Sequence, residues 1–216
     1  MDSWRIALIS ALAAFVLWRN LPGALLCVWP RMLRARGEDE SWPEVDKDLL
    51  SRMEEELVPL GFERLGVHVE RAPLRRGIVA YDFVHQGEST WATARAQGRE
   101  VTLTLLTPFD RGAFVLTADY HVQSHDRPGL FLAGGMPGAQ PEPLLAAHRR
   151  RVDRLKQAGR TPGSDLSLES LVRSANDWFA SFGARAQRMQ HINHLLMTVM
   201  ALGLVGSIAW ALLKPY

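Results

Sequence analysis

The chain has little of several residue types that define common classes of protein. It holds a single cysteine, Cys27, so it forms no intrachain disulfide and its cysteine usage does not favour an oxidising compartment. Only three of its 25 basic residues are lysine, and this bias, with abundant alanine, glycine and leucine, favours a GC-rich bacterial genome. Residues 31–188 carry 22 basic and 22 acidic side chains. A nucleic-acid binder has a basic excess, so nucleic acid is not an expected partner.

Motifs of common catalytic and metal sites are also missing. The sequence has no HExxH or CxxC pattern, and no Lys-Ser or Lys-Thr pair follows the glycine-rich run at residues 134–138. Metal-ligating residue types gather around one short stretch, namely Asp119, His121, His125 and Asp126. Their spacing matches no recognised ligand set, so neither a metal nor another cofactor is expected. Ser124, His125 and Asp126 are adjacent, whereas a catalytic triad assembles distant residues, so no catalytic residue is assigned.

By contrast, residues 195–213 form an uncharged run of 19 residues. As a helix this run is roughly 28 Å long, about the thickness of a bilayer's hydrocarbon core. A second apolar segment, residues 6–18, reaches spanning length if Arg5 and Arg19 extend their side chains to the headgroups. We expect Pro22 and Gly23 to end or kink that helix, with residues 21–29 at the membrane interface.

The alternatives for the first apolar segment are a cleaved signal peptide and a lipoprotein signal. No small-x-small cleavage site follows Trp18, and the residues just before Cys27 lack the small side chain that a lipoprotein signal needs. A retained first span is therefore the preferred interpretation. The resulting organisation is an N-terminal transmembrane or interfacial segment at 1–30, a central domain at 31–188 and a C-terminal transmembrane helix at 189–216.

Arginines next to the two spans predict the topology. Arg31, Arg34 and Arg36 follow the first span, and Arg185 and Arg188 precede the second, whereas the outer ends carry little positive charge. Positive residues favour the cytoplasmic side of a bilayer. We therefore expect a two-pass protein of the cell inner membrane, with its central domain in the cytoplasm and both termini outside.

The central domain is predicted to be α+β. Ser41 and Glu44 have capping-box spacing with Pro43 in the first turn, and Leu49, Leu50, Met53 and Leu57 make one helical stripe. Five strand-like runs follow, separated by short turns, at residues 62–71, 78–85, 89–97, 101–107 and 113–120. Short links favour antiparallel neighbours. The predicted fold is an α+β membrane protein in which two transmembrane helices flank an antiparallel β-meander of about five strands, packed with amphipathic helices.

The rest of the domain reads as a long loop and two helices. Residues 122–140 contain many glycines and prolines and are interpreted as a loop in which Leu130–Leu132 pack under the sheet. A helix follows at 143–156, and another starts at Asp165 or Ser167 and runs towards the second span with a weak point at Gly183. The first of these helices carries a basic cluster of Arg149, Arg150, Arg151 and Arg154. This cluster is either a solvated face, a partner for the acidic stretch 38–48, or a site for anionic lipid or an acidic protein.

Small residues recur along both predicted spans. Gly203, Ser207 and Ala211 are four residues apart, and the first span has a similar strip at Ala7, Ala11 and Ala14. Small side chains let helix backbones approach closely in lipid. The strips are therefore expected to face each other within one chain or to pair two chains into a homodimer.

These features favour a non-enzymatic, membrane-anchored cytoplasmic interaction or regulatory module. The first alternative is a binding domain for a lipid or small amphiphile, with the concave sheet face as its site and the long loop as its mouth. The second is a metal-dependent or other hydrolase. A closed, filled core favours the interaction module, and a cavity lined by the sheet and closed by residues 130–132 favours the first alternative. Titratable groups converging in a cleft around His121 favour the second.

Overall fold

The computed structural model describes residues 3–36, 47–72, 77–97, 100–122, 125–127 and 130–213. The chain divides into two compact units, one formed by residues 1–32, 72–75 and 180–216 and the other by residues 33–71 and 76–179. The predicted Ser41–Glu44 capping box lies outside the described residues, whereas the helix that it was expected to start is present from Lys47.

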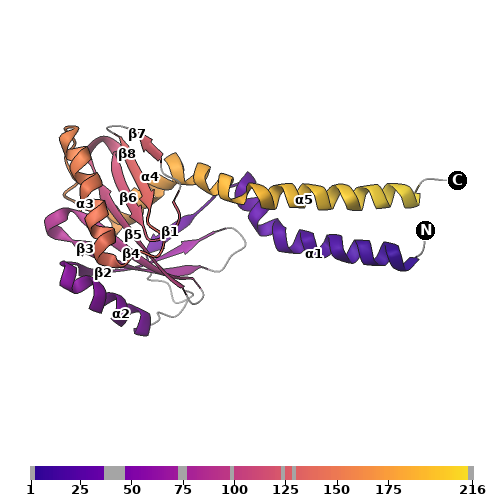
Figure 1. The fold of residues 1–216 in the computed structure, drawn as a ribbon, viewed down its shortest axis with the longest axis horizontal. Helices are drawn as coiled ribbons and strands as arrows, with labels where there is room; N and C mark the ends of the chain where they lie inside the picture. The colour runs from indigo at the N-terminus through magenta and orange to yellow at the C-terminus, as the bar shows by residue number, and fades with distance from the viewer. Residues whose placement is uncertain are drawn as a thin grey trace. The chain divides into compact units, whose positions relative to one another are not determined.

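One sheet organises the second unit, and within the described residues it has eight strands (Figure 1). Their order is β1-β2-β3-β4-β5-β6-β8-β7, and every neighbouring pair is antiparallel except β6 and β8. Their bounds are Leu33–Arg36 (β1), Glu63–Arg71 (β2), Ile78–His85 (β3), Thr90–Gln97 (β4), Glu100–Pro108 (β5), Phe114–Ala118 (β6), His125–Arg127 (β7) and Phe131–Gly135 (β8).

The α+β class is confirmed, whereas the predicted number of strands and the all-antiparallel pairing are wrong. Strands β2 to β6 correspond to the five predicted runs and form the expected meander. The segment interpreted as a loop instead contributes β7 and β8, and β8 lies between β6 and β7. The chain crosses to the far edge before β7 and returns, so β8 runs parallel to β6. Phe131 and Leu132, which were expected to pack under the sheet from a loop, are instead buried as part of that strand.

Glycine makes the tight packing at β8 feasible. A Cβ atom on Gly135 would lie 2.1 Å from the carbonyl oxygen of Tyr120 and 2.5 Å from the amide nitrogen of Val122. Both are backbone atoms, so a methyl group there requires the crossing chain to move. The glycines that made this segment resemble a loop are thus compatible with a strand that another segment crosses closely.

Gly135→Ala is accordingly expected to destabilise the sheet unit by about 2 kcal/mol or more, because overfilling a packed site costs about 1–3 kcal/mol and here backbone must shift. Gly87→Ala is the matched control, since a Cβ at Gly87 meets only His85, at 3.5 Å or more. Denaturant unfolding of the full chain in mild detergent, followed by near-UV circular dichroism, measures both. Equal stability of the two variants would contradict the close approach at Gly135.

Two helices cover one face of the sheet. Helix α2 (Lys47–Leu57) and helix α3 (Pro141–Gln157) both place leucines into the main apolar core. From the strands, that core takes alternate residues: Tyr81 and Phe83 of β3, Ala92 and Ala94 of β4, and Leu103 and Leu105 of β5. The apolar stripe predicted at residues 49–57 is therefore the cover of the sheet, as expected from its spacing.

The intervening polar positions point to the opposite face, which helix α4 (Leu168–Trp178) partly covers. Ser167 caps this helix, because its hydroxyl accepts a hydrogen bond from the Ser170 amide at 3.2 Å. A π-helical turn over Phe179–Gly183 follows, and helix α5 (Ala184–Leu213) continues from it. The departure from α-helical geometry ends at Gly183, the residue predicted as the weak point.

Helix α1 (Ser3–Val28) and helix α5 pack side by side in the first unit (Figure 1). Both are long and apolar enough to cross a bilayer, over Ala7–Val28 and Gln187–Ala211. The alternative that Pro22 and Gly23 end the first helix is wrong, because the helix continues through Pro22 to Val28. A kink at these residues and an interfacial position of 21–29 stay predictions. Gly23, Ala24, Leu26 and Cys27 are buried there, so packing outweighs the amide hydrogen bond that proline cannot donate.

Candidate functional site

A network of buried charges lies on the α4-covered face of the sheet. Glu70 of β2 accepts hydrogen bonds from Arg34 Nε at 2.8 Å and from Arg95 Nε and Nη2 at 2.8 and 3.0 Å. The Arg34 guanidinium also donates to the carbonyl oxygen of Ala175 in α4, at 3.2 Å. Burial alone would raise the pKa of Glu70, but Arg95, His68 and Arg34 outweigh it and hold the pKa well below its usual range. Glu70 is therefore ionised between two fixed guanidinium groups.

His68 links this network to a second carboxylate. Its Nδ1 lies 2.5 Å from Asp82 Oδ2, and its Nε2 lies 3.4 Å from Glu70 Oε1. Thr93 donates to the other Asp82 oxygen at 2.8 Å. Burial lowers the pKa of His68, but Asp82 and Glu70 outweigh burial, so the pKa is raised from its usual value.

The geometry of His68 suits a structural role better than catalysis. A general base needs a ring nitrogen that reaches a substrate. Both ring nitrogens of His68 face carboxylates, and the side chain is only 1 % exposed. The imidazolium, which donates from both nitrogens, satisfies these neighbours, so the network joins β1, β2, β3 and β4 across one face.

One pattern in the sequence indicates this network. His68 and Glu70 are two residues apart in β2, and Thr93 and Arg95 are two apart in β4, so each pair lies on one side of its strand. Charged side chains at alternate positions of neighbouring predicted strands indicate either a solvated face or a paired buried one. Arg34 gave no such signal, because its four-residue strand was not predicted.

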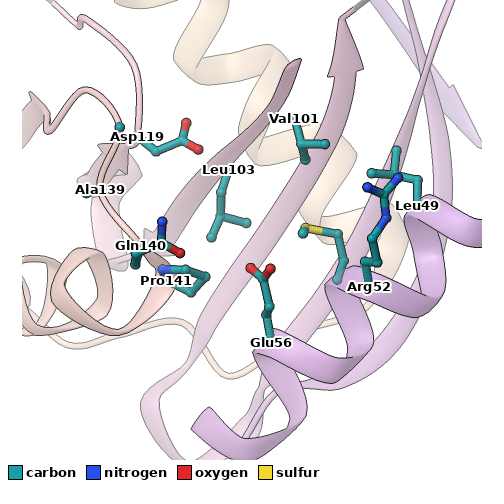
Figure 2. A pocket seen from close by; sticks show the side chains of 11 residues that line it. Leu49, Arg52, Glu56, Val101, Leu103, Asp119, Ala139, Gln140 and Pro141 are labelled. Atoms are coloured by element: carbon teal, nitrogen blue, oxygen red, sulfur yellow. The ribbon is translucent and has the colours of Figure 1, made fainter. Parts of the chain in front are cut away.

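A cleft opens on the other, apolar face of the sheet, with a volume of about 290 Å³ (Figure 2). Its floor is apolar, with Leu49 and Met53 from α2 and Leu103 from β5. Polar side chains stand around that floor, namely Arg52 and Glu56 of α2, Gln140 before α3, and Asp119 after β6. Gly138 and Ala139, from the end of the segment that was predicted to be a long loop, close one side.

Asp119 is a half-buried polar residue of this cleft. Its amide donates to the carbonyl oxygen of Leu103 at 3.0 Å, and its own carbonyl accepts from the Gly138 amide at 2.7 Å, so the backbone fixes its position. Its Oδ1 atom is buried and has no hydrogen-bond partner among the described residues. Burial raises the pKa of this carboxyl above its usual value, although nearby amides and the charge of Arg95 act in the opposite direction. Figure 2 shows the carboxylate directed to the side where Leu103 lies.

The structure places the residues predicted as metal candidates in different surroundings. Asp119 lines the cleft, whereas His121 and Asp126 are exposed, and the side chain of His125 lies outside the described part of the chain. Across the described residues, no group of three or more His, Cys, Asp or Glu side chains is placed to hold a metal ion.

The basic cluster of α3 is partly engaged within the chain. Arg149 pairs with Glu88, the last residue of the 3-10 turn Gln86–Glu88, and Arg151 donates to the Thr117 hydroxyl at 3.0 Å. The predicted acidic partner at 38–48 lies outside the described residues, apart from its last two positions. Arg150 and Arg154 are exposed.

The small-residue strips of the two apolar helices are exposed within one chain. Ala7, Ala11 and Ala14 of α1 and Gly203, Ser207 and Ala211 of α5 all lie on the surface of their unit. The α1–α5 contact instead buries Ala13, Ala24, Thr198 and Ala201. Pairing of two chains through the exposed strips stays a prediction.

Polar side chains also join the two helices. His194 Nδ1 lies 2.9 Å from Asn20 Oδ1, and the Cys27 thiol lies 3.5 Å from the carbonyl oxygen of Arg188. Beside this pair, a Cβ on Gly23 would lie 2.5 Å from His194 Cγ, whereas a Cβ on Gly203 meets nothing within 4 Å. The close approach of α1 and α5 therefore depends on Gly23.

Gly23→Leu is expected to separate or tilt the two helices, whereas Gly203→Leu leaves their distance unchanged in a single chain. Spin labels at positions 12 and 204, in a Cys27→Ala background and at high dilution in lipid, measure that distance. A longer or broader distance distribution is expected for Gly23→Leu alone, with a destabilisation of about 1–3 kcal/mol. A longer distance for Gly203→Leu alone would instead show that the strip at Gly203 forms the intrachain contact.

No family model, curated protein or solved structure matches this chain.

Proposed function

We propose that the chain is a membrane-anchored interaction or regulatory module without catalysis of its own. The observation that carries this proposal is the large apolar surface of α1 and α5. Trp18 of α1 is 78 % exposed, and Met200 and Trp210 of α5 are 68 % and 72 % exposed. The core helix of a soluble protein buries such side chains, whereas lipid tails solvate them. In this proposal the two helices cross the bilayer and hold the sheet unit at its surface.

The polar interior of the sheet unit supports the non-catalytic part of the proposal. Two fully buried histidines are engaged within the fold: His68 lies between Asp82 and Glu70, and His148 lies between Thr107 and Thr117. Groups paired in this way stabilise a fold and are not presented to a substrate. The exposed Arg150 and Arg154 then offer positive charge to an acidic protein partner or to anionic lipid.

Membrane fractionation tests the anchoring. We expect the full-length chain to stay in the pellet through alkaline carbonate extraction and to require detergent for release. A chain truncated after Gly183 and lacking residues 1–32 serves as the comparison and is expected in the soluble fraction if it folds. Full release of the intact chain by carbonate would contradict a spanning anchor.

Topology is a separate part of the proposal, supported by the arginines that flank both helices. We place the sheet unit in the cytoplasm and both termini outside. In a Cys27→Ala background, a cysteine introduced at exposed Ser51 of α2 should react with a membrane-impermeant maleimide only after lysis. One appended after Tyr216 should react in intact cells. The opposite labelling pattern would show that the sheet unit lies outside and the C-terminus lies in the cytoplasm.

The cleft favours a second candidate function, the binding of a lipid or small amphiphile. It combines an apolar floor with a polar rim, as ligand pockets commonly do, and its volume lies at the small end of their range. It is bordered by the sheet and by Gly138 and Ala139 at the end of the segment 122–140, whereas residues 130–132, which were expected to close such a site, do not line it. This candidate is compatible with membrane anchoring and extends it.

A further inference from the structure

The residues that line the cleft between α2 and β5 favour one chemical class of ligand. This inference rests on the second candidate function proposed above. Three charged side chains line it: the carboxylates of Asp119 and Glu56 and the guanidinium of Arg52. Its lining therefore carries one net negative charge above an apolar floor. Arg52 and Glu56 are exposed and solvated, whereas the Oδ1 atom of Asp119 is buried.

An unpaired buried acceptor is costly, because its contact with water is lost and nothing replaces it. Asp119 is held in this state by the backbone hydrogen bonds to Leu103 and Gly138. A ligand that brings an N–H group to the part of the Asp119 carboxylate that lines the cleft would supply a partner for this half-buried carboxylate, while its apolar part covers Leu103 and Met53. A ligand with a positively charged donor should bind most tightly, because a charge-assisted hydrogen bond is stronger than a neutral one.

We propose that this cleft binds a small organic cation, an apolar molecule that carries a primary ammonium group, with Asp119 accepting the hydrogen bond. The floor of Leu49, Met53 and Leu103 takes the hydrocarbon part. A carboxylate-bearing ligand is disfavoured by the same charge. The ammonium comes either from a free amine or from the headgroup of an aminophospholipid, and the two sources share this chemistry.

The test is isothermal titration calorimetry on the full chain in nanodiscs made only of phosphatidylcholine, which has no primary amine. Hexylamine is the probe, and hexanol is the uncharged molecule of the same length. Lysophosphatidylethanolamine, compared with lysophosphatidylcholine, probes the headgroup source. Three variants accompany the wild type: Asp119→Asn removes the charge at nearly constant shape, Ala139→Leu narrows the cleft, and Asp153→Asn removes an exposed carboxylate on α3 outside the cleft. Near-UV circular dichroism establishes that each variant is folded.

We expect an amine to bind at least tenfold more tightly than its matched control, and Asp119→Asn to weaken it by about tenfold or more, since hydrogen bonds to charged groups contribute about 1.5–3 kcal/mol. Ala139→Leu should also weaken binding, and Asp153→Asn should leave it unchanged. Binding of the lysolipid alone, dependent on Asp119, supports the proposal with the headgroup as the source.

Amine binding that is unchanged in Asp119→Asn overturns the inference, as does the absence of amine binding. If hexanol and hexylamine bind equally and Ala139→Leu weakens both, the cleft still binds amphiphiles and only the cation preference fails. If no amphiphile binds, the second candidate function fails with it. Anchoring is decided independently by the carbonate extraction.

Discussion

Replacing Glu70 by glutamine is expected to destabilise the sheet unit by about 3–5 kcal/mol, the usual cost of removing one partner from a buried ion pair. The amide keeps the shape of the side chain but leaves Arg34, Arg95 and His68 around a neutral group, while Asp82 is the only remaining carboxylate of the network. Arg34 and Glu70 side chains are 6 % and 7 % exposed, so water cannot replace the lost charge. The free energy of unfolding of an ordinary domain is about 5–15 kcal/mol, so this loss is a large part of it.

Native-state hydrogen exchange of peptides from β3 and β4 measures this effect in the full chain, because it reports opening of the sheet without unfolding the apolar helices. Glu88→Gln is the control, since its partner Arg149 is 51 % exposed and surface pairs contribute about 1 kcal/mol or less. A loss below about 1 kcal/mol for Glu70→Gln would show that the network adds little to stability.

Acid is expected to destabilise the sheet unit through His148. This buried side chain of α3 contacts the hydroxyls of Thr107 and Thr117, at 2.8 and 3.0 Å. Burial and the charge of Arg151 lower the pKa of His148 to about 3. In the unfolded chain the imidazole takes up a proton near pH 6.5, whereas the folded chain excludes it until about pH 3. The stabilising contribution is therefore complete above pH 6.5 and is lost as the pH falls towards 3.

At pH 4 the loss from this one group is about 3 kcal/mol relative to pH 7, by the usual relation between pKa shift and free energy. Other groups also titrate in this range, so the measurement is a difference between two proteins. Denaturant unfolding at pH 7 and pH 4 should show that the wild type loses about 3 kcal/mol more than His148→Gln. Equal acid sensitivity would mean that His148 accepts a proton in the folded chain.

The sequence predicted those elements whose residue pattern itself indicates which side chains are buried. Alternating residues such as Val101, Leu103 and Leu105 have one buried face, and the structure places them in the core beside the leucines of α2. The five-strand meander followed because its turns are short. The same reasoning missed β1, β7 and β8, because β1 has four residues with two arginines, β7 has only three residues and β8 ends in two glycines. Their strand character comes from pairing with neighbouring strands, a tertiary effect that local patterns do not contain.

Prediction of the candidate site was partial for a related reason. Asp119 was singled out as a residue type that binds metals, together with His121 and Asp126, because all lie close in sequence. The structure separates them, since Asp119 turns into the cleft while His121 and Asp126 are exposed. Its cleft partners Arg52 and Glu56 come from a helix more than sixty residues away in the chain. No spacing rule links them, because the sheet brings α2 and the end of β6 together.

The two ends of the sheet bear on how the protein behaves when many copies are crowded together. The edge strands β1 and β7 have four and three residues, and their sequences, LRAR and HDR, are rich in charge. A long, apolar edge strand is a template on which another chain adds its own strand and starts a fibril. Short edges offer few free amide and carbonyl groups, so a second chain gains few hydrogen bonds by adding a strand there. Edge-to-edge addition, the first step of amyloid-like growth, is therefore disfavoured at both ends of the sheet.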